Sequence, residues 1–277
     1  MKNKSKLMKL LITVFVFLIL VLLLVIIFLV KRISNLKLDN SKPKVQVVTK
    51  KYVVKNYEDI VFDFRNANVK FELTDSEKLI IKQKGKTGMY LINVSSNKNK
   101  LNIKEKQTNY FLKTKFTVYI PRIYEEKIDV INAFSNIEIC SLENELEINN
   151  NAGNIKLKDI NDVTVENVSG TIRINKVFEN IDFNSSTGDL IINSLTGKCN
   201  ITTITGDVKI GKFEILSNSF FETTSGDIKI KVDKNSICKL KVKNQSGKNK
   251  INKKKCNSKD NLLEIKNITG NVNIDWL

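Results

Sequence analysis

Two segments in the C-terminal half decide the fold: IDFNSSTGDLII at residues 181–192 and CNITTITGDVKI at residues 199–210. In each segment apolar and polar side chains alternate on both sides of a glycine, which is the pattern of strands with one buried face. A threonine precedes each glycine, and this pair suits a turn that needs a positive φ angle. The motif therefore predicts two short strands joined by a tight turn.

The motif recurs, and the recurrence predicts the architecture. Seven copies stand at 146–157, 163–174, 181–192, 199–210, 219–230, 240–251 and 263–274. Their turn glycines are Gly153, Gly170, Gly188, Gly206, Gly226, Gly247 and Gly270. One such unit cannot bury its own apolar face, whereas units stacked about 4.8 Å apart build a continuous core.

We therefore predict an all-β, single-domain β-solenoid in which successive coils pair in parallel, as in a parallel β-helix with repeats of about 18 residues. Its regular part covers residues 130–277, and residues 45–129 form an irregular β-rich cap of the same domain, because no Pro- or Gly-rich linker separates the two. An antiparallel β-sandwich of repeated hairpins is the alternative.

The N-terminus carries an apolar run. Residues 10–30 contain 21 residues without a charge or a proline, enough for one transmembrane helix. The run is too long for a cleaved signal peptide and is followed by Lys31-Arg32 rather than by small residues. We expect a basic tail at 1–9, a helix in the lipid bilayer at 10–30 and a basic spacer at 31–44.

The orientation of this anchor rests on the flanking charges. Lysine and arginine stand on both sides of the run, more densely on the short tail. We expect a single-pass protein of the cell membrane with the tail inside and the solenoid extracytoplasmic, since long domains translocate largely regardless of charge. A basic spacer lying against anionic headgroups would favour the opposite orientation.

Composition excludes several classes of site. The chain has no histidine, so catalysis by Ser-His-Asp or Cys-His and His-liganded metal sites are excluded. Four cysteines, Cys140, Cys199, Cys238 and Cys256, form no C-x-x-C pair, and we expect free thiols. We predict no catalytic residue, no cofactor and no metal site, and hence no enzyme.

The formal net charge is +17, of which +8 belongs to residues 1–44. Only four of the 46 basic residues are arginine and no element clusters arginine with aromatics, so we expect no nucleic-acid partner. Counting from each turn glycine predicts an outward stripe that could bind a polyanion: Lys156, Arg173, Lys209, Lys229 and Lys250. The alternative is local pairing, of Asp207 with Lys209 and of Asp227 with Lys229.

A second column follows the glycines directly. Asp189, Asp207 and Asp227 would stack about 5 Å apart and repel one another. Either they accept backbone N–H groups of their own turns, or a cation bridges them.

The chain resembles the bacterial putative adhesin family, also called the Toastrack domain. The resemblance rests on NANVKFELTDSEKLIIKQKG (66–85), KFTVYIP (115–121) and the TGDVKI and SGDIKI repeats. It implies a β-solenoid on the bacterial membrane or cell surface, often associated with envelope-stress responses, and no known catalytic residues. The chain departs from the family pattern because Asp follows Gly in only three of the seven copies.

Three functions follow from these observations. The first is a non-catalytic, membrane-anchored envelope protein that contacts an anionic cell-wall polymer or another envelope protein. The second is an intracellular, membrane-associated scaffold that polymerises end to end. The third is a solenoid enzyme acting on acidic polysaccharide. We favour the first.

Overall fold

The computed structural model describes residue 26 and residues 45–86, 90–106, 114–252 and 261–277. Contacts between residues divide the chain into a unit of residues 1–44 and a unit of residues 45–277. Of the predicted membrane helix only Ile26 is described, so that prediction lies outside the described residues. Nowhere in the described ranges is a helix both long enough and apolar enough to cross a membrane.

All the described strands belong to the unit of residues 45–277. In its described part they are β1 (Gln46–Val53), β2 (Asp59–Phe64), β3 (Asn68–Thr74), β4 (Lys78–Gly85), β5 (Ile92–Asn97), β6 (Lys100–Glu105), β7 (Lys115–Pro121), β8 (Lys127–Asn132), β9 (Ile137–Ile139), β10 (Leu146–Asn150), β11 (Ile155–Asn167), β12 (Ile172–Thr187), β13 (Leu190–Thr205), β14 (Val208–Ile215), β15 (Ser219–Ser225), β16 (Ile228–Val232), β17 (Cys238–Ser246), β18 (Asn249–Ile251), β19 (Asn261–Thr269) and β20 (Val272–Trp276).

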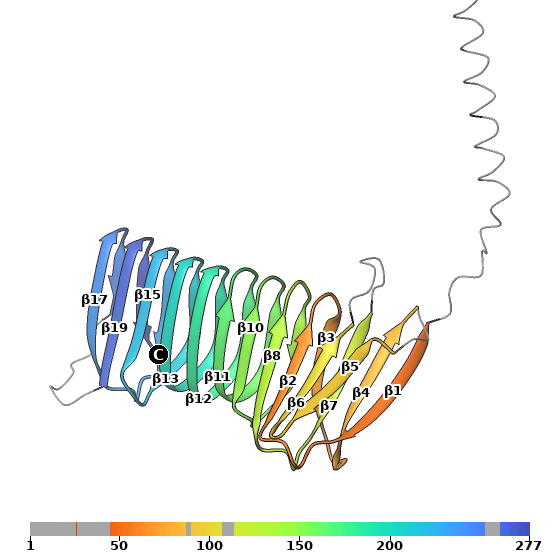
Figure 1. Cartoon of the computed structure of the whole chain (residues 1–277). Helices are drawn as coiled ribbons and strands as arrows, with labels where there is room; N and C mark the ends of the chain where they lie inside the picture. The colour runs from red at the N-terminus through yellow and green to blue at the C-terminus, as the bar shows by residue number, and fades with distance from the viewer. Residues whose placement is uncertain (1–25, 27–44, 87–89, 107–113, 253–260) are drawn as a thin grey trace, which may run out of the picture. The chain divides into compact units, whose positions relative to one another are not determined.

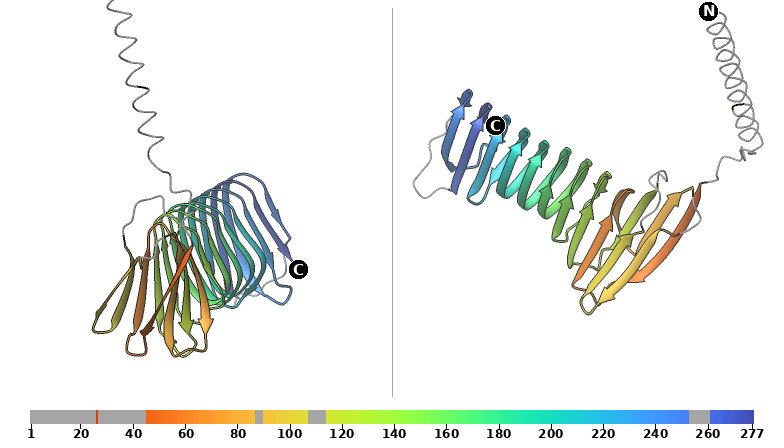
Figure 2. Two further views of the ribbon diagram at one scale, coloured as in Figure 1. Left: turned by 90° about the vertical axis from the view of Figure 1, so that its right-hand side faces the viewer. Right: turned by 45° about the horizontal axis from the view of Figure 1, so that its top comes forward.

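The strands stack coil upon coil into two ladders on either side of one core (Figures 1 and 2). Ladder A runs β5, β6, β2, β8, β10, the second halves of β11 to β13, then β15, β19 and β17. Ladder B runs β1, β4, β7, β3, β9, the first halves of β11 to β13, then β14, β16, β20 and β18.

Pairing is parallel along most of the stack. Among the described strands the antiparallel pairs are β1 with β4, β4 with β7, and β5 with β6, all towards the N-terminal end. The prediction of an all-β domain with a largely parallel, solenoid-like sheet is therefore confirmed.

The core follows from the alternation within each strand. In β10, Leu146 and Ile148 point inward and are fully buried, while Glu147 and Asn149 point outward. Phenylalanine fills the N-terminal part of the core, where the rings of Phe62 and Phe71 meet edge to face with centroids 5.0 Å apart. One continuous core thus runs through the stack.

The coils do not follow chain order at either end of the stack. β19 lies between β15 and β17, and β20 lies between β16 and β18. Likewise β2 lies between β6 and β8, and β3 lies between β7 and β9. The expectation that successive coils always pair with each other is therefore wrong at the two ends.

Burial explains why the coil of β17 and β18, and not the last coil of the chain, ends the stack. The coil of β17 and β18 is rich in lysine, and its inward residues Leu240, Val242 and Ile251 are only partly buried. The coil of β19 and β20 carries Leu263 and Ile274, which are fully buried between neighbours on both sides. The less apolar coil therefore ends the stack, where one side of its core lacks a neighbour.

The turn glycines show why the motif needs glycine. Gly206 has a φ of +146°, and a Cβ there would overlap the carbonyl oxygen of Gly188 in the preceding coil. Both the backbone angle and the close stacking of turns therefore require a residue without a side chain. Positive φ angles occur at Gly153, Gly170, Gly188, Gly206, Gly226, Gly247 and Gly270.

Candidate functional site

The five basic residues of the expected stripe lie at outward-facing positions of ladder B. All are exposed, and we call them the cationic ladder: Lys156, Arg173, Lys209, Lys229 and Lys250. Ile191 interrupts the row after Arg173. Because the last coil is inserted, Asn273 separates Lys229 from Lys250.

No residue of the cationic ladder forms an ion pair within the described ranges. The local pairing of Asp207 with Lys209 and of Asp227 with Lys229 is thus not formed. Neighbouring strands lie about 4.8 Å apart, so adjacent cations repel each other. A bound anion would relieve this repulsion, and a polymer could do so at several coils at once.

The carboxylates of the aspartates that follow the turn glycines accept hydrogen bonds from backbone N–H groups. The Asp189 carboxylate accepts the backbone N–H of Asp207 at 3.0 Å, and Asp207 accepts that of Asp227 at 2.8 Å. Asp227 in turn accepts the N–H of Asn271 at 2.7 Å. Each acceptor serves the neighbouring coil rather than its own turn, so these side chains fasten one coil to the next.

A hollow of about 570 Å³ lies at the N-terminal part of the cationic ladder. Lys156 and Arg173 line it together with Lys158, Glu138 and Cys140. The prediction considered only the third residue after each turn glycine and therefore missed Lys158. This residue stands two positions after Lys156 and so points to the same side of the strand. Three cations against one carboxylate make this hollow suited to a phosphate or carboxylate group.

The thiols give no sign of a reactive or metal site. Cys199 is fully buried and Cys140 is partly buried, both as free thiols, and Cys238 is buried; Cys256 lies outside the described residues. Burial raises the pKa of the Cys199 thiol well above its ordinary value, which keeps it protonated and inert. Across the described ranges no group of three or more Cys, Asp or Glu side chains is arranged to hold a metal ion.

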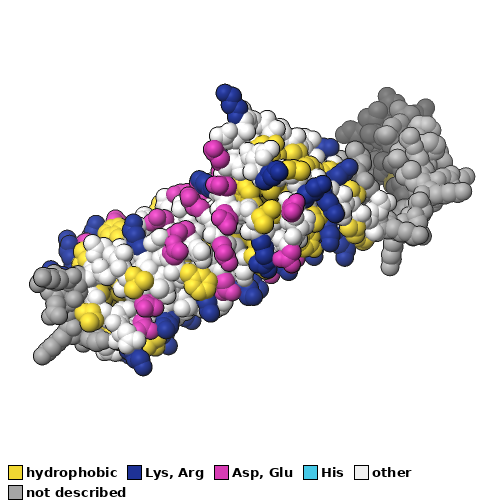
Figure 3. All heavy atoms as spheres, turned by 90° about the horizontal axis from the view of Figure 1, so that it is seen from below, with side chains coloured by type: hydrophobic (Ala, Val, Ile, Leu, Met, Phe, Trp, Pro, Cys, Tyr) yellow, Lys and Arg dark blue, Asp and Glu magenta, His cyan; other side chains and the backbone are white. Residues whose placement is uncertain are grey.

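Negative charge gathers elsewhere. Seen from below, Asp and Glu side chains crowd the middle of the edge that carries the connections between coils (Figure 3). Exposed acids of these connections include Glu125, Glu126, Glu143 and Glu145, and Glu179 is exposed in the middle of β12. These acidic side chains therefore lie apart from the outward positions of ladder B that carry the cationic ladder.

Comparison with solved structures finds bacterial proteins described as putative adhesins or cell adhesion proteins. A putative adhesin from Bacteroides fragilis NCTC 9343 is 15% identical, with 83% of this chain and 98% of that chain covered and a TM-score of 0.49. A putative adhesin from Parabacteroides distasonis ATCC 8503 is 15% identical, with 84% and 97% covered and a TM-score of 0.46. A putative cell adhesion protein from Clostridium sporogenes ATCC 15579 is 11% identical, with 84% and 100% covered and a TM-score of 0.31.

One family model matches most of the chain, whereas no curated protein matches the chain. The model of the Toastrack DUF4097 family matches residues 57–275, which include β2 to β19 and nearly all of β20. The chain therefore belongs to the Toastrack DUF4097 family.

Proposed function

We propose that this protein is a non-catalytic, membrane-anchored protein of the bacterial cell envelope, and that its solenoid binds an anionic surface polymer through the cationic ladder. The observation that carries the proposal is the row of five exposed cations that lack ion-pair partners among the described residues. A rigid stack presents these charges in one row, at intervals of one or two coils. A polymer with regularly spaced phosphates or carboxylates can therefore bind several of them without losing much conformational freedom.

The ligand test uses charge-matched variants of residues 45–277 and purified anionic wall polymer. The ladder variant changes Lys209, Lys229 and Lys250 together to Gln. A lysine near an anionic surface contributes about 1 kcal/mol, so three changes should weaken the Kd by about 100-fold. Binding should also fall steeply as salt rises past about 0.15 M, where the screening length is about 8 Å.

The matched control changes three exposed lysines of ladder A that lack ion pairs with described residues: Lys198, Lys239 and Lys243. It removes the same net charge from the same unit. Equal weakening by both variants would show that net charge alone holds the polymer, and the cationic ladder would then not be the site.

The membrane part of the proposal rests on the apolar run at residues 10–30. A helix there would hold the solenoid at the outer surface of the membrane, close to wall polymers and anionic headgroups. Protease added to intact, wall-stripped cells tests this topology. If the solenoid survives while a known external protein is digested, the domain is cytoplasmic and the scaffold hypothesis replaces the envelope hypothesis.

The absence of catalysis is part of the proposal. Residues 45–277 should turn over neither acidic polysaccharides nor model esters, with or without calcium. Turnover that disappears in Asp207→Ala while circular dichroism stays unchanged would establish an enzyme instead.

A further inference from the structure

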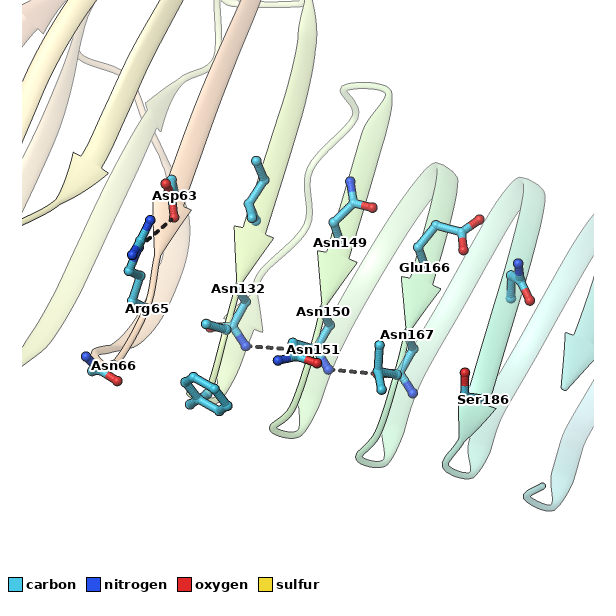
Figure 4. Close-up of a pocket in the computed structure, with 15 residues that line it drawn as sticks. Asp63, Arg65, Asn66, Asn132, Asn149, Asn150, Asn151, Glu166, Asn167 and Ser186 are labelled. Atoms are coloured by element: carbon cyan, nitrogen blue, oxygen red, sulfur yellow. Dashed lines mark hydrogen bonds and ion pairs between the residues drawn. The ribbon is translucent and has the colours of Figure 1, made fainter. Parts of the chain in front are cut away.

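Ladder A carries a groove of about 600 Å³ on the opposite side of the core from the cationic ladder. It crosses five neighbouring coils, because β2, β8, β10, β11 and β12 each contribute outward-facing side chains (Figure 4). The coils repeat about every 4.8 Å. An extended chain lying along the stack would therefore meet one outward-facing set of side chains from each coil, and the chemistry of that set differs from coil to coil.

The groove has an exposed apolar end. The Phe134 side chain lines it with 65% of its surface exposed, and Ile131 at 42% and Val168 at 51% also line it. The backbone of Phe134 is held in place because its N–H donates to the carbonyl oxygen of Arg65 at 3.0 Å. The exposed ring on this fixed backbone offers a flat apolar face to a ligand.

The rest of the groove offers hydrogen-bonding groups that are still available. Glu166, Asn184 and Ser186 line it, and their side chains form no hydrogen bond with any described residue. Asn149 donates to Glu147 at 3.2 Å, which leaves its side-chain carbonyl oxygen available. Amide, hydroxyl and carboxylate groups together provide both donors and acceptors, as ligand hydroxyl groups require.

The floor beneath these groups is rigid. Asn132 donates to Asn150 at 2.6 Å, and Asn150 donates to Asn167 at 2.7 Å, all three buried. At the rim, the buried Glu105 carboxylate accepts hydrogen bonds from the backbone N–H groups of Arg65, Asn66 and Ala67. The groove is therefore preorganised, which lowers the entropy cost of binding.

Charge separates this groove from the cationic ladder. The Asp63 carboxylate lies 3.8 Å from the Arg65 guanidinium and 2.7 Å from the Lys104 ammonium, and Glu166 adds a second carboxylate, so these charges cancel. A near-neutral groove does not attract a polyanion. An aromatic face beside hydrogen-bonding groups suits pyranose rings, which have apolar C–H faces and hydroxyl groups at their edges.

We infer that this groove is a second binding site, for an uncharged glycan chain that lies along the solenoid with one sugar ring against Phe134. The inference is independent of the proposed function, because it uses the other face of the unit and a different kind of ligand.

The test uses the full chain in detergent micelles and a panel of uncharged oligosaccharides built from N-acetylglucosamine, glucose, mannose or galactose. Saturation-transfer NMR should show transfer to at least one of them, and calorimetry should give saturable binding that high salt leaves unchanged. Phe134→Ala and Asn184→Ala should each weaken that binding at least tenfold.

Phe178→Ala is the matched control, because Phe178 is 49% exposed in the middle of β12 and does not line the groove. It should bind as the parent does, and so should the ladder variant. Both Phe134 and Asn184 are exposed, so unchanged thermal midpoints should accompany the loss of binding. No binding of any oligosaccharide in the panel, or equal losses in Phe134→Ala and Phe178→Ala, would overturn the inference.

Discussion

Replacing Gly206 by alanine tests the stacking of the turns most directly. Gly206 has a φ of +146°, a backbone conformation that residues with side chains rarely adopt. Holding alanine in such a conformation costs about 1–3 kcal/mol. The new methyl group would also overlap the carbonyl oxygen of Gly188, a backbone atom that cannot rotate away.

The two costs can be added as an order of magnitude. Forcing an extra carbon into a packed site costs about 1–3 kcal/mol through displaced backbone. Together with the backbone term, Gly206→Ala should destabilise the unit by about 2–6 kcal/mol. For a unit of this size we expect the Tm to fall by roughly 5–20 °C.

The assay is thermal and urea unfolding of residues 45–277, followed by far-UV circular dichroism. Gly85→Ala is the matched control, because Gly85 is buried, has no φ in the left-handed region, and would place its Cβ 3.3 Å from the Thr114 hydroxyl oxygen. The control should lose less than about 1 kcal/mol. If Gly206→Ala unfolds at the same midpoint as Gly85→Ala, the account of the turns is refuted.

Three further predictions concern buried polar, thiol and carboxylate groups. Asn150→Ala should cost about 2–4 kcal/mol in urea unfolding, because it leaves the buried side-chain oxygen of Asn167 without its 2.7 Å donor; a loss below about 1 kcal/mol would contradict the buried network. Cys199 should resist alkylation in the native protein and react only in denaturant, since burial raises its pKa; mass spectrometry that finds rapid native labelling would contradict this. The 2.6 Å contact with Lys127 lowers the pKa of Glu147 from its ordinary 4.5, so ionised Glu147 stabilises the fold above that pH and this stabilisation is lost as the pH falls through the lowered value. Glu147→Gln should therefore flatten the acid decrease in Tm below about pH 4.5, and an unchanged acid profile would show that the contact does not contribute.

The local structure of each coil could be predicted from its residues. Alternation in residues 199–210 predicted strands with one buried face, and Ile201, Val208 and Ile210 are buried while Thr202 is exposed. Such patterns are readable because the side-chain period of a strand depends only on neighbouring residues. The same alternation is why the cationic ladder could be named before its geometry was known.

The arrangement of coils at the ends of the stack could not be predicted in this way. Every coil presents a similar row of backbone donors and acceptors, so the local pattern does not say which coil pairs with which. The partners of β19 depend on how much apolar surface each coil buries when all of them compete for places in the stack.

The groove on ladder A likewise combines features that the sequence predicts with features that only the tertiary structure sets. Asn149 and Asn150 are adjacent and chemically identical in the sequence, yet one lines the outside and the other belongs to the buried network. Alternation alone separates those two, but it does not bring Arg65 beside Phe134, 69 positions later. The sequence by itself determined the strands, the turns and the two faces of each coil, because these depend on near neighbours. Only the tertiary structure decided which coils meet and hence where a groove forms, because that depends on burial summed over the whole stack.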